Sequence, residues 1–176
     1  TGSIGESVLS VIKENHSELN LFGITFHKNI NKSQEIIKDF KPEFAYVEDR
    51  STFEDQKDTS DITFLNGDSS LKELIEHDDV DVIISAISGF AGLKATYLAA
   101  STGKKILLAN KESIVAGGDL ITARAKKFNS KIIPIDSEHN AIFQCLSGER
   151  SPDDVQKIII TASGGPFIGK KISDLK

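Results

Sequence analysis

Two carboxylates flank a single serine directly after an apolar run of the chain. Asp136 and Glu138 follow the run Lys131–Ile135, and Ser137 lies between them. In an extended backbone, side chains two residues apart point the same way, so both carboxylates can face one point. Carboxylate oxygens are the ligands that Mg²⁺ and Mn²⁺ prefer. The pattern indicates a divalent-cation site that needs a third ligand from elsewhere. An Asp helix cap followed by a first-turn Glu is the structural alternative.

A glycine-containing turn opens the chain. It reads Thr1-Gly2-Ser3-Ile4-Gly5, and the apolar residues that follow, from Val8 to Ile12, have helical spacing. Glycines let the backbone approach a pyrophosphate closely, and the start of a helix favours its negative charge. An ordinary glycine turn in which Ser3 caps the helix explains the same residues equally well.

The apolar run Leu21–Phe26 ends in a basic turn, His27-Lys28-Asn29. NAD-binding folds place an acidic residue about 20 residues after their glycine turn to hold the ribose 2′-hydroxyl, whereas a cation suits the 2′-phosphate of NADP. No carboxylate follows this run until Glu35. The turn therefore favours NADP over NAD, and a solvated loop lysine is the alternative.

Two further turns follow apolar runs. Ser85–Gly92 is small and largely apolar, which suits a nicotinamide ring or close packing between a strand and a helix. Asn110-Lys111-Glu112-Ser113 combines an amide, a cation and a carboxylate that can orient a polar substrate and the nicotinamide end of a cofactor. Alternatively, Asn110 caps a helix, and the carboxylate of Glu112 in its first turn interacts favourably with the helix dipole. This structural alternative explains Lys111 least well.

The last glycine turn is Thr161–Phe167, which offers the Ser163 hydroxyl and accessible amides to an anion such as phosphate, or simply turns the chain. His139 and Cys145 suggest a nucleophilic pair, but their spacing on a helix separates them by roughly 240°. We therefore interpret Cys145 as a small core residue.

Apolar runs and helical patterns alternate along the whole chain and must position these turns. Alternation at this spacing predicts βαβ units, and thus an α/β protein with a Rossmann-like, doubly wound parallel sheet. Ligands of such sheets bind beyond the carboxyl ends of the strands, where the polar turns stand. The expected strands are 21–26, 45–47, 62–65, 80–85, 105–109, 131–135 and 157–160, and the expected helices are 31–40, 69–77, 91–102, 112–128 and 138–146.

Three details of this pattern carry further expectations. The run Val80–Ser85 has the continuous apolar character of a strand covered on both faces. The polar stretch Asp49–Asp61 is expected to be an exposed excursion. A doubly wound domain ordinarily begins with a strand, whereas here the glycine turn comes first, so the opening strand is expected to be missing.

Composition excludes several classes of partner. The chain has 176 residues, a net charge of −5 and a pI near 5.4, so it has no basic field for nucleic acid or an anionic membrane. No apolar run approaches the roughly 18 residues of a membrane span. The single cysteine excludes an internal disulfide and favours a reducing compartment. The absence of Met and Trp indicates a processed terminus or a piece of a longer chain.

Taken in order, four motifs resemble the 1-deoxy-D-xylulose 5-phosphate reductoisomerases, and the resemblance runs over essentially the whole chain. It implies an NADPH- and Mg²⁺- or Mn²⁺-dependent enzyme of the non-mevalonate isoprenoid pathway. Such an enzyme rearranges the sugar phosphate 1-deoxy-D-xylulose 5-phosphate and then reduces it to 2-C-methyl-D-erythritol 4-phosphate. The full-length protein would be a homodimer, cytoplasmic in bacteria or plastid-targeted in some eukaryotes. The motifs are Thr1–Gly5, Leu108–Ser113, Ile135–Gln144 and Thr161–Phe167.

The resemblance also implies roles for single residues. Lys28 and Asn29 would meet the 2′-phosphate, and Ala86 would line the cofactor near its nicotinamide. The phosphates and ribose of NADPH would be held by Thr1, Gly2, Ser3 and Ile4, with further cofactor contacts from Asn110 and Glu112. The metal would be held by Asp136 and Glu138. The substrate would be contacted by Lys111, Ser137, Glu138 and Ser163, with Ser163 toward its phosphate. The catalytic set would be Lys111, Asp136, Glu138 and His139, of which His139 lies close to the site.

The resemblance divides the chain into an NADPH-binding domain, residues 1–135, and the start of an α/β catalytic domain, residues 136–176. The family fingerprint begins with a further glycine after the first strand, and its third metal ligand, flap and C-terminal domain come after the point where this chain stops. We therefore expect the chain as given to be inactive. Two other readings stay open: another NADP-dependent Rossmann dehydrogenase, and a module that binds NADP without chemistry.

Overall fold

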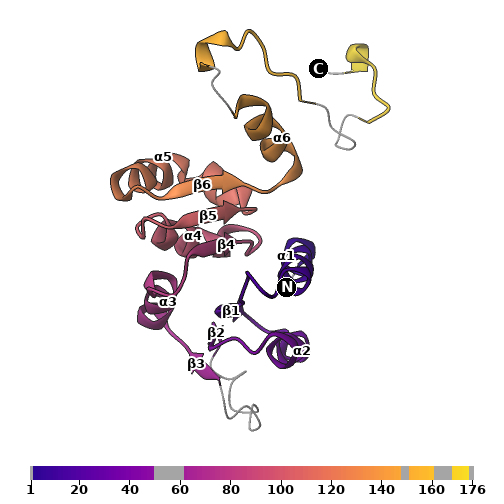
Figure 1. Cartoon of the computed structure of the whole chain (residues 1–176). Helices are drawn as coiled ribbons and strands as arrows, with labels where there is room; N and C mark the ends of the chain where they lie inside the picture. Colours follow the sequence, from indigo (N-terminus) through magenta and orange to yellow (C-terminus); the bar gives the residue numbers. More distant parts are fainter. Residues whose placement is uncertain (1, 50–61, 148–150, 161–167, 175–176) are drawn as a thin grey trace. The chain divides into compact units, whose positions relative to one another are not determined.

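The chain divides into two compact units, Thr1–Asp136 and Ser137–Lys176. The computed structural model describes residues 2–49, 62–147, 151–160 and 168–174 (Figure 1). Most of the expected excursion at Asp49–Asp61 therefore lies outside the described residues. The two units are described separately below.

A first parallel sheet follows the opening helix of the first unit. Its strands are in the order β1-β2-β3, with Gly23 opposite Phe44 and Phe44 opposite Thr63. The crossover helix α2 buries Ile36 and Ile37 against apolar residues of the sheet, because its apolar side chains recur at helical spacing. The elements are α1 (Ser3–Glu14), β1 (Gly23–Phe26), α2 (Ile30–Phe40), β2 (Phe44–Val47) and β3 (Thr63–Leu65) (Figure 1).

A second parallel sheet has the order β4-β5-β6. Its strands end in register, since Ser85 pairs with Leu108 and Leu108 pairs with Pro134. The turns after all three strands therefore begin at one edge of the sheet. The elements are α3 (Asp68–Glu76), β4 (Val82–Ser85), the 3₁₀ turn η2 (Phe90–Gly92), α4 (Leu93–Ala99), β5 (Lys105–Leu108), α5 (Lys111–Phe128) and β6 (Lys131–Pro134).

One apolar cluster joins residues from both sheets. It contains Tyr46 of β2 and Ile106 of β5, together with buried side chains of α3, α4 and α5. Ile106 and Ile121 are fully buried. Removing such side chains from water contributes about 1.5–3 kcal/mol each, so this cluster is the main stabilising core of the unit.

The parallel α/β fold expected from the sequence is confirmed. In a doubly wound sheet of order 3-2-1-4-5-6, the first strand stands between the second and the fourth. The order β4-β5-β6 matches the 4-5-6 side of such a sheet, whereas β1-β2-β3 has one strand more than the two that this pattern places beyond its first strand. Among the described residues β1 pairs only with β2 and β4 only with β5. The expectation that both faces of Val80–Ser85 are covered is wrong, because Val82 is 39% exposed in this edge strand.

In the second unit, α6 (Ser137–Leu146) is followed by the 3₁₀ turns η3 (Pro152–Asp154) and η4 (Ile172–Asp174). The strand expected at 157–160 is not formed, and Ile159 is 77% exposed. A strand needs a neighbour for its backbone hydrogen bonds, and the described part of this unit contains no other strand. The core position expected for Cys145 is also wrong: the thiol is exposed, on a helix without a buried residue.

No helix in the part of the chain that the structure describes is long and apolar enough to cross a lipid bilayer.

Candidate cofactor-binding site

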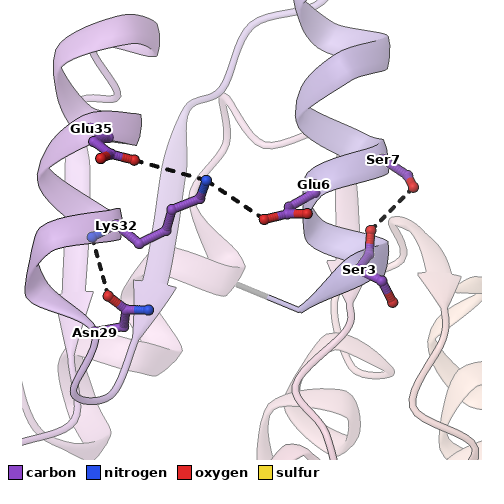
Figure 2. A network of polar contacts seen from close by, with 6 residues as sticks. All are labelled: Ser3, Glu6, Ser7, Asn29, Lys32 and Glu35. Atoms are coloured by element: carbon purple, nitrogen blue, oxygen red, sulfur yellow. Dashed lines mark hydrogen bonds and ion pairs between the residues drawn. The ribbon is translucent and has the colours of Figure 1, made fainter.

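The start of α1 is open. Gly2 is the residue that caps this helix, its backbone is extended, and no side chain completes the cap. The cap expected from Ser3 is therefore wrong; Ser3 lies inside the first turn, where its carbonyl accepts a hydrogen bond from the Ser7 hydroxyl at 3.1 Å (Figure 2). A Cβ added at Gly2 would meet nothing within 4 Å. The first-turn amides of a helix need acceptors from outside it, so this end suits an anion.

The turn after β1 presents exposed polar groups beside a well-formed helix start. Asn29 caps α2 by accepting a hydrogen bond from the backbone N–H of Lys32 at 3.2 Å. His27 and Lys28 precede it and are exposed. Among the described residues, Lys28 forms no ion pair. Its ammonium group is therefore available to an anionic ligand.

An ion pair links the starts of these two helices. The ammonium of Lys32, in the first turn of α2, lies 3.6 Å from a carboxylate oxygen of Glu6 in the first turn of α1. It also lies 3.9 Å from Glu35 on its own helix (Figure 2). Exposed pairs of this kind contribute about 0.2–1 kcal/mol each. The pair with Glu6 joins the first turns of the two helices that follow the glycine turn and the basic turn.

Asn110 joins two turns at the edge of the second sheet. Its side chain caps α5 by accepting from the backbone N–H of Ser113 at 2.7 Å, which confirms the structural reading of this residue. The same side chain donates to the carbonyls of Ile87 and, at 2.9 Å, Gly89. Asn110 is 2% exposed. Both amide protons are used within the protein, so a cofactor can receive one only if such a bond breaks.

The backbone reinforces this junction. The amides of Ala109 and Asn110 both donate to the carbonyl of Ser85, at 2.9 and 3.0 Å. Lys111 and Glu112, the first residues of α5, are exposed, and Ala86 is half-buried. The structure thus brings Ala86, Asn110, Lys111 and Glu112 together at one sheet edge, with the last two open to a ligand.

The candidate metal ligands stand at the division between the two units. Asp136 closes the first unit, whereas Ser137, Glu138 and His139 begin α6 in the second. The extended backbone assumed for residues 136–138 is wrong from Ser137 onward, because α6 starts at that residue. The Ser137 hydroxyl donates a hydrogen bond to the Glu138 carboxylate at 3.0 Å. The residues that the structure describes contain no group of three or more His, Cys, Asp or Glu side chains that could hold a metal. The two carboxylates suit a hard cation in their chemistry but form an incomplete ligand set.

Some of the predicted site residues lie outside the described residues, and other residues of the site were not predicted from the sequence. Thr1 and Ser163 are not among the described residues. The buried Thr96 was not singled out as a candidate, although a hydroxyl among the apolar positions of a short helix is a signal for an internal polar contact. Gly92, which was not proposed either, has no room for a side chain: a Cβ at this position would lie 2.6 Å from the Ile87 carbonyl oxygen and against the Asn110 side-chain amide.

Parallel strands that cross over through helices, with glycine and polar turns at their carboxyl ends, define a Rossmann-like α/β protein. Two family models match the chain: 1-deoxy-D-xylulose 5-phosphate reductoisomerase over residues 1–118, and the C-terminal domain of the same enzyme over residues 132–176. The chain belongs to the 1-deoxy-D-xylulose 5-phosphate reductoisomerase family.

Curated relatives agree with this assignment. The reductoisomerase of Francisella tularensis subsp. novicida is 46% identical over 99% of this chain, and that of Clostridium botulinum is 41% identical over 99%. The chain covers 46% of each of these proteins, so it spans about half the length of the relatives it matches.

Solved structures of the family resemble the fold. The reductoisomerase of Zymomonas mobilis in complex with NADPH has a TM-score of 0.88 and 37% identity, covering 99% of this chain and 46% of that one. A reductoisomerase in complex with NADPH, fosmidomycin and magnesium has a TM-score of 0.78 and 40% identity, covering 83% of this chain and 37% of that one. These comparisons do not favour a different dehydrogenase or a non-catalytic module.

Proposed function

We propose that this chain is the cofactor-binding part and the start of the catalytic part of an enzyme that converts 1-deoxy-D-xylulose 5-phosphate to 2-C-methyl-D-erythritol 4-phosphate. Residues 1–135 are the NADPH-binding domain in this proposal, and residues 136–176 begin the catalytic domain. Two observations carry it within a chain of this family: the start of α1 is open, and Lys28 is exposed and forms no ion pair among the described residues.

The groups near α1 and α2 fit the phosphates of NADPH. Gly2 leaves room for a pyrophosphate beside the first-turn amides. Thr1, Ser3 and Ile4 are the further residues proposed to contact the phosphates and ribose. Lys28 and Asn29 would receive the 2′-phosphate. The nicotinamide end would lie along Ala86, Asn110 and Glu112. When bound, NADPH supplies the hydride of the reduction.

The catalytic part would use the residues around Asp136. Lys111, Ser137, Glu138, His139 and Ser163 are the proposed substrate contacts or catalytic groups. Asp136 and Glu138 would supply two oxygen ligands to Mg²⁺ or Mn²⁺, which polarises the substrate's carbonyl and hydroxyl oxygens. Because these carboxylates alone are an incomplete set, we expect the 176 residues by themselves to be inactive. We further propose that the whole enzyme is a homodimer, cytoplasmic in a bacterium or plastid-located in a eukaryote.

Lys28→Ala is expected to weaken NADPH binding by about tenfold and to leave NADH binding unchanged, because only NADPH carries the 2′-phosphate. The measurement is a titration of nicotinamide fluorescence with the 176-residue chain. Lys38→Ala, at the far end of α2, removes the same charge and is the matched control. Equal weakening of NADPH and NADH by Lys28→Ala, or no weakening, would contradict the role of Lys28.

Asp136→Asn is expected to lower turnover by about a hundredfold in a protein that joins this sequence to the remaining half of a family member, since metal polarisation supplies several kcal/mol. NADPH affinity should stay within about twofold, because the cofactor groups precede this residue. Turnover is followed by NADPH oxidation with substrate and Mn²⁺. Asp119→Asn, on the exposed surface of α5, serves as the control. Full activity of the Asp136 variant would refute its assignment as a metal ligand.

A further inference from the structure

A buried hydroxyl joins three segments around the candidate nicotinamide end of the site. Thr96, in α4, has no exposed surface. Its Oγ1 lies 2.7 Å from the Ser85 hydroxyl at the end of β4, 2.8 Å from the Gly92 carbonyl, and 3.3 Å from the Ser113 hydroxyl in the first turn of α5. Ser85 is 6% exposed and Ser113 is fully buried, so water does not replace these partners.

The number of protons sets the direction of these bonds. A threonine hydroxyl has one proton and two lone pairs, so it cannot donate to both Gly92 and Ser113. The Gly92 carbonyl can only accept. The Thr96 proton is therefore directed to the Gly92 carbonyl or to the more distant Ser113 hydroxyl, and the hydroxyl of Ser85 donates to Thr96. The single proton of Thr96 and the lone pair that accepts from Ser85 are thus both used within the protein.

Together with Asn110, this hydroxyl holds the segment 86–92 at several points. The Thr96 hydroxyl bonds to Ser85, the residue directly before this segment, and to the carbonyl of Gly92, the last residue of the segment. Asn110 fixes the carbonyls of Ile87 and Gly89 between them. The bond between Thr96 and Ser113 joins α4, the helix that follows this segment, to the start of α5, where Lys111 and Glu112 lie.

We propose that Thr96 is a positioning residue for the nicotinamide end of the cofactor site. It contacts no ligand; it sets the segment 86–92 against the first turn of α5. This inference rests on the proposed binding of NADPH. The adenosine end is proposed to lie on α1 and the β1–α2 turn, which contain none of the groups that Thr96 contacts.

Thr96→Val tests this role because valine keeps the shape of threonine and removes the hydroxyl. Three buried polar groups then lose a partner, and the segment 86–92 should loosen. NADPH binding should weaken by about tenfold, whereas adenosine 2′,5′-bisphosphate, which lacks the nicotinamide half, should bind as before. Thr96→Ser keeps the hydroxyl and should restore NADPH binding to within about threefold.

The matched control is Thr122→Val in α5. The Thr122 hydroxyl also donates to the carbonyl four residues earlier, that of Gly118, at 2.7 Å, but it is exposed, and its other acceptor, the Asp119 carbonyl, lies in the same helix. This variant should change neither ligand's affinity. Equal loss of both ligands in Thr96→Val would mean general destabilisation and would overturn the positioning role, as would unchanged NADPH binding.

Amide hydrogen exchange gives a readout that needs no ligand. In Thr96→Val, amides of residues 86–92 and 111–114 should exchange about tenfold faster, with those of α2 and β2 unchanged. A uniform increase across the unit would reject the positioning role. If the unsubstituted chain binds neither NADPH nor the bisphosphate, the proposed cofactor function fails, and the exchange pattern still decides the role of Thr96.

Discussion

Asn110→Asp lowers the free energy of unfolding by about 3 kcal/mol or more, even though aspartate is as good a helix cap as asparagine. The substitution keeps an acceptor for the Ser113 amide but replaces the donor that the Ile87 and Gly89 carbonyls share. The two part-buried carbonyls then face a carboxylate oxygen, and a charge stands without a partner at a position that is 2% exposed. Urea unfolding followed by circular dichroism measures the loss.

Asn29→Asp is the matched control for this result. Asn29 also caps a helix through its side-chain oxygen, but it is exposed, and within the described part of the chain its amide nitrogen donates to no carbonyl. The same substitution there should change stability by less than about 0.5 kcal/mol, or raise it slightly, since an acidic group favours a helix start. Similar effects of the two variants would show that Asn110 acts only as a cap.

Gly92→Ala is expected to cost about 3 kcal/mol of stability. The backbone of Gly92 has an ordinary φ of −76°, so the penalty is steric. A Cβ would lie 2.6 Å from the Ile87 carbonyl and against the Asn110 amide. Neither neighbour can move freely, because the first is backbone and the second is held by its own hydrogen bonds. The methyl group must therefore displace Asn110 from the segment that it clamps.

Gly118→Ala, in α5, is the control for this steric effect. Its Cβ would lie 3.3 Å from a methyl of Ile114, and alanine is the better helix former, so stability should stay equal or rise. The double variant of Gly92→Ala and Asn110→Asp should lose less than the sum of the two, because both disrupt one set of bonds. Full additivity in urea unfolding would argue against a shared mechanism.

The alternation of apolar runs and helical patterns was enough to predict most of the fold. Strands such as Lys105–Leu108 are specified by their own apolar run and by the helices on either side. The expected strand at 157–160 shows the limit of this reasoning. Its isoleucines have the composition of a strand, but pairing depends on a neighbour, and a local pattern carries no information about the neighbour.

The candidate site was only partly predictable for a similar reason. The helix cap at Asn110 follows from the sequence around it, and the structure confirms it. The second role of Asn110, toward Ile87 and Gly89, depends on the parallel register that brings the ends of β4 and β5 together. The bond of Thr96 to Ser113 and the ion pair of Lys32 with Glu6 likewise join separate elements. The helix expected at 138–146 is present as α6 and begins one residue earlier, at Ser137, so only the extended backbone assumed between Asp136 and Glu138 is wrong.

The division of the first unit into two sheets also affects how the protein opens and refolds. Each sheet is built from strands consecutive in the sequence, so each can form from local crossovers without waiting for the other. The apolar cluster that joins Tyr46 and Ile106 couples the two, but the ladders of backbone hydrogen bonds are separate. Because that shared cluster is the main core, the two halves are expected to open together in hydrogen exchange. Both ends of a bound dinucleotide would then gain and lose their supporting sheet in the same event.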